Sequence, residues 1–326
     1  MELLHAIIQL FAEPWVWLIV VASVMYGAGN YIDELLLSRY EQEVGTLVLI
    51  SSLFGAIIAT GFLAYGLTTD ISFFDDKAIA TKALFVGFLE VLWIIPYLYA
   101  TERSGAIIAG PLFQAVPVFA LIIESFYGII PPAIQIVGAC IIVLGGIVLS
   151  IEKEEDEDSV ISSKINYGTL GLMSLSAAVV SIIYVLFKDA ALAGSFTFVG
   201  FWTGTGMFVT GTAIYCLWKP YREQFHKFTN NTNYKAIALQ AINEVLDAGG
   251  VYMTHLANTL GPSVMVVTAF NATQPIAVGM IGWLLTYFGA GSISSDSASI
   301  RGWLLISIGL FLVSMGIIVL ALGGYN

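Results

Sequence analysis

Two glycine-patterned stretches, one near the end of each half of the chain, decide how the fold is interpreted. Residues 137–150 read VGACIIVLGGIVLS, and residues 308–321 read IGLFLVSMGIIVLA. Each contains two glycines seven residues apart, Gly138 and Gly145 in the first and Gly309 and Gly316 in the second, followed by an IVL ending. Two similar apolar stretches in corresponding places indicate an internal repeat.

The composition indicates a membrane protein. Of the 326 residues, 58% are hydrophobic and 11% are charged, whereas soluble domains carry about 25% charged residues. Apolar runs of about 20 residues are long enough to cross a bilayer core of about 30 Å. The net charge of −11 argues against nucleic acid as a partner. We predict ten helices that cross the lipid bilayer, near residues 15–37, 46–67, 81–100, 104–127, 132–151, 168–190, 195–218, 234–257, 261–288 and 300–322.

The acidic segment EKEEDEDSVISSK, at residues 152–164, separates two sets of five predicted helices. It is charged and rich in serine, which is typical of a solvated linker. We therefore divide the chain into a first five-helix repeat at 1–151, the linker at 152–164, and a second five-helix repeat at 165–326.

Two further similarities occur in the same order in both halves. The third predicted helix contains EVLW at Glu90–Trp93, and the eighth contains EVLD at Glu244–Asp247. The fourth contains QAVPV around Pro117, and the ninth contains ATQPI around Pro275. Five helices per repeat is an odd number, so the second repeat enters the membrane in the opposite direction, as in many secondary transporters with a central substrate site. The sequence therefore predicts an all-α integral membrane protein with ten transmembrane helices as two inverted five-helix repeats.

Residues 100–149, ATERSGAIIAGPLFQAVPVFALIIESFYGIIPPAIQIVGACIIVLGGIVL, resemble the fourth-to-fifth-helix signature of the drug/metabolite transporter superfamily, in its EamA-like branch. One departure is YGIIPP at Tyr127–Pro132, where many members have Gly-Glu. The resemblance implies a ten-helix bundle that moves small metabolites by alternating access, without naming the substrate. The residues that fit the signature are Ala100, Pro117, Val118, Gly138 and Gly145, and more loosely Ala257, Pro275, Gly309 and Gly316 in the second half.

Carboxylates inside the predicted helices mark a candidate site. An ionisable group at the bilayer centre costs about 2.5–3.5 kcal/mol, so it normally faces the bundle interior or a water-filled cavity. Glu90, Trp93 and Tyr97 share one face of the third helix, and Glu244 and Asp247 lie on a polar stripe of the eighth. These two faces could converge on one cavity, or they could form hydrogen bonds that hold the bundle together.

We predict that both halves contribute to one substrate-binding site, and that prolines kink the two helices beside it. Kinked helices expose backbone carbonyls in transporter sites, although prolines are also common in purely structural transmembrane helices. The predicted kinks are at Pro117 and Pro275. The predicted substrate-binding residues are Glu90, Trp93, Tyr97, Gln114, Asn243, Glu244, Asp247, Asn271 and Gln274.

Other polar residues and the glycines receive simpler interpretations. We expect Asp33 or Glu34 at the membrane interface, Lys188 reaching out to an interface, and His255 packed near a loop. Glu124 could face a vestibule or the headgroups, and the sequence does not choose. The regularly spaced glycines predict close packing of the fifth helix against the tenth, or of two protomers in a homodimer.

Missing motifs narrow the function. The three histidines form no HExxH motif and no carboxylate–histidine cluster, and the sequence predicts no metal site or cofactor. A core of acids, amides and aromatics disfavours strongly anionic solutes, which need Arg or Lys contacts. We therefore predict a secondary active exporter or exchanger of small neutral, zwitterionic or cationic metabolites, such as amino acids or amines, in the inner cell membrane. Proton coupling through the carboxylates stays open, and the alternatives are a channel or receptor-like membrane protein and, with less support, an intramembrane enzyme.

Overall fold

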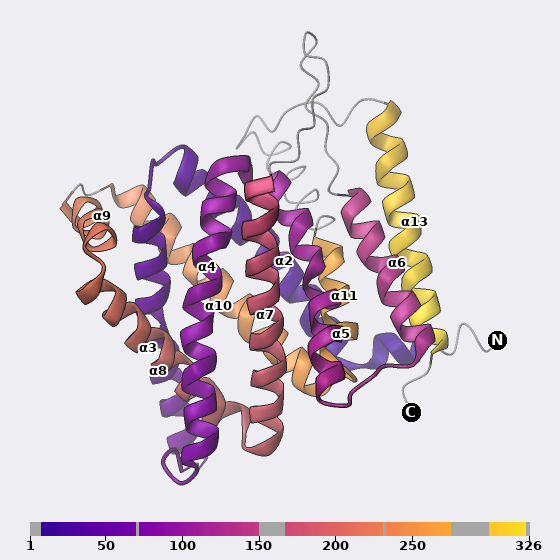
Figure 1. Cartoon of the computed structure of the whole chain (residues 1–326), viewed down its shortest axis with the longest axis horizontal. Coiled ribbons are helices and arrows are strands. Elements are labelled where there is room, and N and C mark those ends of the chain that lie inside the picture. Colours follow the sequence, from indigo (N-terminus) through magenta and orange to yellow (C-terminus); the bar gives the residue numbers. More distant parts are fainter. Residues whose placement is uncertain (1–7, 70–71, 150–166, 231–232, 275–299, 324–326) are drawn as a thin grey trace.

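The computed structural model describes residues 8–69, 72–149, 167–230, 233–274 and 300–323, and all regular elements within these ranges are helices (Figure 1). The first half contains α2 (Pro14–Ser38), α3 (Val44–Thr68), α4 (Lys77–Leu112), the 3₁₀ turn η1 (Phe113–Ala115), α5 (Val116–Phe126) and α6 (Ala133–Leu149). The second half contains α7 (Tyr167–Ala193), α8 (Phe196–Leu217), α9 (Lys219–Asn230), α10 (Tyr234–Leu260), α11 (Val264–Ala269), η2 (Phe270–Thr273) and α13 (Ile300–Leu322). The predicted linker at 152–164 lies outside the described residues.

Length and hydropathy identify membrane-crossing helices among the described residues. Four helices are long and apolar enough to cross a bilayer: α2, α3, the Lys77–Ser104 part of α4, and α7. Shorter apolar helices lie at Phe113–Phe126, Ala133–Gly145 and Ser307–Leu320. The described part of the chain is thus all-helical, and its long apolar helices are those of a multi-pass membrane protein, while the count of ten crossings stays a prediction.

Side-chain caps and one glycine set several helix ends. Ser195 Oγ accepts the Phe198 N–H at 3.1 Å at the start of α8, and Ser263 Oγ accepts the Val266 N–H at 3.1 Å at the start of α11, as serine caps commonly do. Gly128 has a φ of 73° in the turn between α5 and α6, a conformation that favours glycine. This turn is the YGIIPP segment in which the sequence departs from the EamA-like signature.

The helices pack in five main pairings: α6 with α13, α3 with α8, α2 with α10, α4 with α7, and α4 with α8. The α6–α13 pair stands at one side of the bundle in Figure 1. A Cβ atom built on Gly138 would lie 2.8 Å from the backbone N of Leu320, and one on Gly145 would lie 2.8 Å from that of Val313. The glycines therefore allow the two backbones to touch. The predicted packing of the fifth helix against the tenth is confirmed within a single chain.

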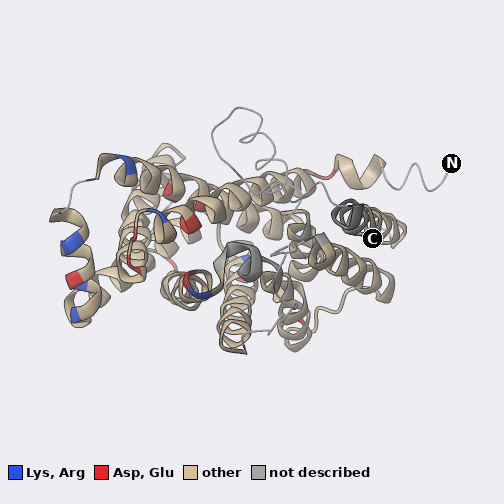
Figure 2. Ribbon diagram, turned by 90° about the horizontal axis from the view of Figure 1, so that it is seen from above, with Lys and Arg blue, Asp and Glu red and all other residues tan. Residues whose placement is uncertain are grey.

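The polar helix α9 lies between α8 and α10 in sequence and packs against the start of α3. Gln224 Oε1 accepts the Gly45 N–H at 2.9 Å, and Lys227 Nζ lies 2.6 Å from Glu43 Oε1. Figure 2 shows that most of the described ribbon carries no charge and that several Lys and Arg residues gather at the α9 side. Charge is thus concentrated where a helix lies outside the apolar bundle.

Candidate functional site

A cavity of about 1270 Å³, including the space at its open side, lies inside the bundle and is lined from both halves of the chain. Its walls come mainly from α2, α3, α4, α7 and α10, with contributions from η1, α11 and η2. Asn243 does not line the cavity, and its side chain is buried behind it. The other eight predicted substrate-binding residues do line it: Glu90, Trp93, Tyr97, Gln114, Glu244, Asp247, Asn271 and Gln274.

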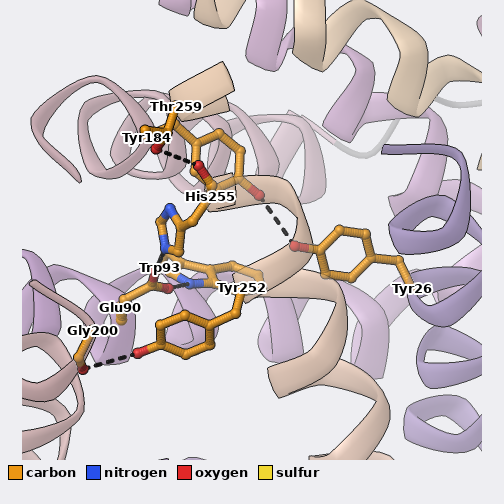
Figure 3. Close-up of polar contacts among 8 residues, drawn as sticks. All are labelled: Tyr26, Glu90, Trp93, Tyr184, Gly200, Tyr252, His255 and Thr259. Atoms are coloured by element: carbon orange, nitrogen blue, oxygen red, sulfur yellow. Dashed lines mark hydrogen bonds and ion pairs between the residues drawn. The ribbon is translucent and has the colours of Figure 1, made fainter. Parts of the chain in front are cut away.

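Glu90 on α4 forms a buried pair with His255 on α10 (Figure 3). Glu90 Oε1 lies 3.0 Å from His255 Nε2, and Glu90 Oε2 accepts the indole N–H of Trp93 at 2.9 Å. The imidazole of His255 stacks on the ring of Phe187, with the ring centroids 3.8 Å apart. Both oxygens of Glu90 therefore have a partner within the protein. The expectation that His255 packs near a loop was wrong, because its ring pairs with Glu90 and is fully buried.

Three tyrosines surround this pair. The hydroxyls of Tyr26 and Tyr184 lie 3.3 Å apart, and the Tyr252 hydroxyl donates to the Gly200 carbonyl at 3.5 Å (Figure 3). The ring of Tyr184 meets His255 edge-on, with centroids 5.5 Å apart. All three tyrosines line the cavity, so this end of it is aromatic.

A second polar group joins α2, α4 and α10. The Tyr97 hydroxyl lies 2.9 Å from Asn30 Oδ1 and 3.2 Å from Asp33 Oδ2. Asn243 Nδ2 donates to Asp33 Oδ1 at 2.8 Å and to Asp247 Oδ2 at 3.2 Å, and so bridges the two carboxylates. Asp33 is only 6% exposed, because side chains of α4 and α10, Tyr97 and Asn243, cover its carboxylate. The expected position of Asp33 at the membrane interface was wrong.

Glu244 links α10 to α3. Its Oε1 accepts from the hydroxyl of Ser51 at 2.7 Å and from the amide of Gln240 at 2.6 Å. Gly29 lies close by on α2, where an added Cβ atom would stand 2.3 Å from Asp247 Oδ1. The absence of a side chain at Gly29 therefore leaves room for the Asp247 carboxylate.

Breaks in helical structure place the remaining predicted residues. Gln114 is buried in η1, between the end of α4 and the start of α5, and Pro117 is the second residue of α5. Asn271 lies in η2, and its Oδ1 accepts from the Ser23 hydroxyl at 3.1 Å. The predicted kink at Pro275 lies outside the described residues. The first-half break falls immediately before the Pro-Val pair.

Two charged residues hold the segment that connects α10 to α11. Glu124 is 1% exposed, and its carboxylate accepts the N–H groups of Val264 at 2.7 Å and Met265 at 3.0 Å. A carboxylate in this position caps the start of α11 and interacts favourably with its dipole. Lys188 Nζ donates to the Gly261 carbonyl at 2.9 Å. Glu124 therefore faces the protein interior, and Lys188 binds a turn of the chain instead of only reaching an interface.

Several cavity residues were not among the predicted set, although the sequence held a signal for some of them. Tyr26, Asn30 and Asp33 are spaced i, i+4 and i+7, which is one helix face. His255 is eleven residues after Glu244, which places it on the same face of α10. Tyr184 and Ser51 stand in apolar surroundings and had no such signal. Helical spacing could thus have recovered part of the set.

Residues 13–151 match the EamA-like transporter family. A solved structure described as "Crystal structure of protein" is similar with a TM-score of 0.57, covering 92% of this chain and 97% of that chain at 16% sequence identity. A similarity at this identity shows the fold alone. The search of curated proteins found no match.

Proposed function

Residues 13–151 belong to the EamA-like transporter family, within the drug/metabolite transporter superfamily, and from this premise we propose that the chain is a secondary active transporter of small organic metabolites. The family resemblance predicted from the sequence is confirmed. A membrane transporter of this type is a protein of the lipid bilayer, and its partner is a small solute. Beyond the family match, we propose that the protein works by alternating access, that it exports or exchanges its solute, and that it lies in the inner cell membrane.

The observation that carries this proposal is the cavity shared by the two halves. Glu90 of EVLW and Glu244 of EVLD are both buried at its wall, one on α4 and one on α10. Carboxylates in a membrane bundle are costly unless they serve a site or a pathway. Their convergence on one cavity lined from both halves supports a solute site at the interface of two repeats.

Helix packing also supports the inverted repeat. If the repeat relates α2 to α7, α3 to α8, α4 to α10 and α6 to α13, it exchanges the α4–α7 pair with the α10–α2 pair. The same exchange of the two repeats leaves the α3–α8 pair and the α6–α13 pair unchanged, because each joins two corresponding helices. All four of these pairings occur among the described helices, whereas the counterpart of the α4–α8 pair, α3 with α10, is only a slight contact. We therefore propose ten crossings, in repeats at 1–151 and 165–326 joined by the acidic linker at 152–164.

The lining favours neutral, zwitterionic or cationic solutes, such as amino acids or amines. Four carboxylates line the cavity, at Asp33, Glu90, Glu244 and Asp247, and no Lys or Arg is among its described lining residues. Strongly anionic solutes would lack the basic contacts that they need. The same carboxylates could carry a proton in exchange for the solute, which we include in the proposal.

Counterflow in liposomes tests the function. Purified protein is reconstituted in vesicles loaded with one unlabelled amino acid or amine, and uptake of the same labelled compound is followed. A carrier that alternates access accumulates label transiently, whereas a channel equilibrates it without overshoot. We expect overshoot for the wild type and for Glu223→Gln, a control on the exposed helix α9. For Glu244→Gln we expect a counterflow rate that is lower by about tenfold or more, and a tenfold change is equivalent to about 1.4 kcal/mol. If none of the amino acids and amines tested produces overshoot, the proposal is refuted.

A further inference from the structure

The cavity has an acidic end, with Asp33, Glu244 and Asp247, and an opposite end, with Glu90. The carboxylates at the two ends differ in the partners that the protein gives them. We propose that the cavity binds an organic cation in one orientation, with a protonated amine at Asp33 and Asp247 and an aromatic or apolar body against the tyrosines near Glu90. This inference rests on the proposed function, because it names the substrate class and the orientation of the solute in the same cavity.

The acidic end has only neutral donors. Asp33 and Asp247 share the amide of Asn243, and Asp33 also faces the Tyr97 hydroxyl. Glu244 accepts from Ser51 and Gln240, which are also uncharged. No ion pair to any of these three carboxylates occurs in the described part of the chain. Negative charge without a partner is costly away from water, so a cationic ligand would offset this cost.

The opposite end already has its basic partner. Both oxygens of Glu90 are occupied, one by His255 and one by the indole N–H of Trp93. His255 is completely buried and is held by stacking on Phe187. An incoming ammonium group would have to displace these contacts, so Glu90 is the poorer binding position for it.

A buried acceptor at the acidic end has no partner. The Asn243 side chain is 1% exposed, and its Oδ1 makes no hydrogen bond to any described residue. Asn243 Oδ1 and Asp247 Oδ1 both flank the empty Cβ position of Gly29, at 3.4 and 2.3 Å. An ammonium group has three donors and no acceptor. The carboxylates of Asp33 and Asp247, which line the cavity, supply the acceptors that a primary amine needs, and the Asn243 amide behind them joins the two.

The rest of the lining suits an organic body better than a bare ion. Phe54, Trp93, Phe113, Tyr184 and Tyr252 all line the cavity. Aromatic faces attract organic cations and bury apolar groups. No group of three His, Cys, Asp or Glu side chains that could hold a metal ion occurs among the described residues.

Binding in detergent tests the inference without requiring transport. Three probes of one size are titrated by isothermal calorimetry: 2-phenylethylamine as the cation, 2-phenylethanol as the neutral analogue and phenylacetate as the anion. They are measured on the wild type, Asp33→Asn, Asp247→Asn, Glu90→Gln and the exposed control Glu223→Gln. A sodium chloride titration at constant ionic strength, balanced with potassium chloride, is the inorganic arm. Near-UV circular dichroism verifies that each variant is folded.

We expect the amine to bind the wild type about tenfold more tightly than the alcohol, equivalent to about 1.4 kcal/mol, and phenylacetate not to bind. Asp33→Asn and Asp247→Asn should lose this preference, while Glu90→Gln and Glu223→Gln should keep it. The inference is overturned if no probe binds, if amine and alcohol bind equally, if sodium binding depends on Asp247, or if Glu90→Gln alone removes the preference. Amine binding without counterflow would refute transport and leave the cation site standing, so the two failures are distinguishable.

Discussion

The cap of α11 by Glu124 leads to a prediction with a definite magnitude. The carboxylate accepts two backbone N–H groups, from Val264 at 2.7 Å and from Met265 at 3.0 Å, in a site that is almost fully buried. A hydrogen bond to a charged group contributes about 1.5–3 kcal/mol, and a buried donor left unpaired costs a similar amount. Glu124→Ala removes both bonds, so we expect the free energy of unfolding to fall by about 3–6 kcal/mol.

Glu124→Gln should keep one of these two hydrogen bonds and remove the other. The amide oxygen can still accept one N–H group, but its NH₂ group then faces the other N–H, and two donors cannot pair. We expect a loss of about 1.5–3 kcal/mol for this variant, intermediate between the wild type and Glu124→Ala. The shift should reach the cavity as well, because α11 and η2 carry Thr268 and Asn271 to its wall.

Equilibrium unfolding in mixed micelles, followed by circular dichroism, measures these values. Glu223→Gln is the matched control, because Glu223 forms an exposed pair with Lys219 on α9 at 3.4 Å, and such pairs contribute at most about 0.5 kcal/mol. If Glu124→Ala unfolds like the Glu223→Gln control, Glu124 does not cap α11 in the folded protein and the reasoning fails.

Three other predictions concern packing, the Glu90 pair and pH. Gly145→Leu should destabilise the α6–α13 contact by about 1–3 kcal/mol or more, measured by the same unfolding assay. Gly171→Ala should not, because nothing lies within 4 Å of an added Cβ there. Trp93→Phe should lower the free energy of unfolding by about 1.5–3 kcal/mol, because it leaves Glu90 Oε2 without its donor. Trp17→Phe, at an exposed site, should lower it less. Equal losses would contradict the buried role of Trp93. The hydrogen bond to Glu43 raises the pKa of Lys227 above its ordinary 10.5, so its stabilising effect is complete below that pH and is lost as the pH rises through the folded-state pKa. Lys227→Gln should flatten this alkaline dependence in unfolding scans, and an unchanged pH profile would show that the pair has no effect.

The sequence predicted features that depend on spacing within one helix. Gly138 and Gly145 lie on one side of a helix, so their role in close packing follows from local geometry, and only the partner helix had to be inferred from the repeat. The EVLW and EVLD similarity likewise placed Glu90 and Glu244 in corresponding helices. The cavity in the structure contains both.

Features that depend on contacts between distant helices could not be predicted. His255 and Glu90 are 165 residues apart, and no local pattern pairs them. Asp33 was misjudged because the side chains that bury it, Tyr97 and Asn243, lie 64 and 210 residues away in sequence. The length of α4 was also missed, because the helix continues to Leu112 and the chain breaks only at η1.

The central claim is that one cavity is reached alternately from the two sides of the membrane. The most direct measurement uses Val251→Cys, at the cavity wall on α10, in a background where the exposed Cys140 and Cys216 are replaced by serine. The protein is reconstituted in liposomes and treated from each side in turn with a membrane-impermeant thiol reagent. We expect modification from both sides, slowed by a transported solute in each case. Modification from one side only, with or without that solute, would contradict this claim.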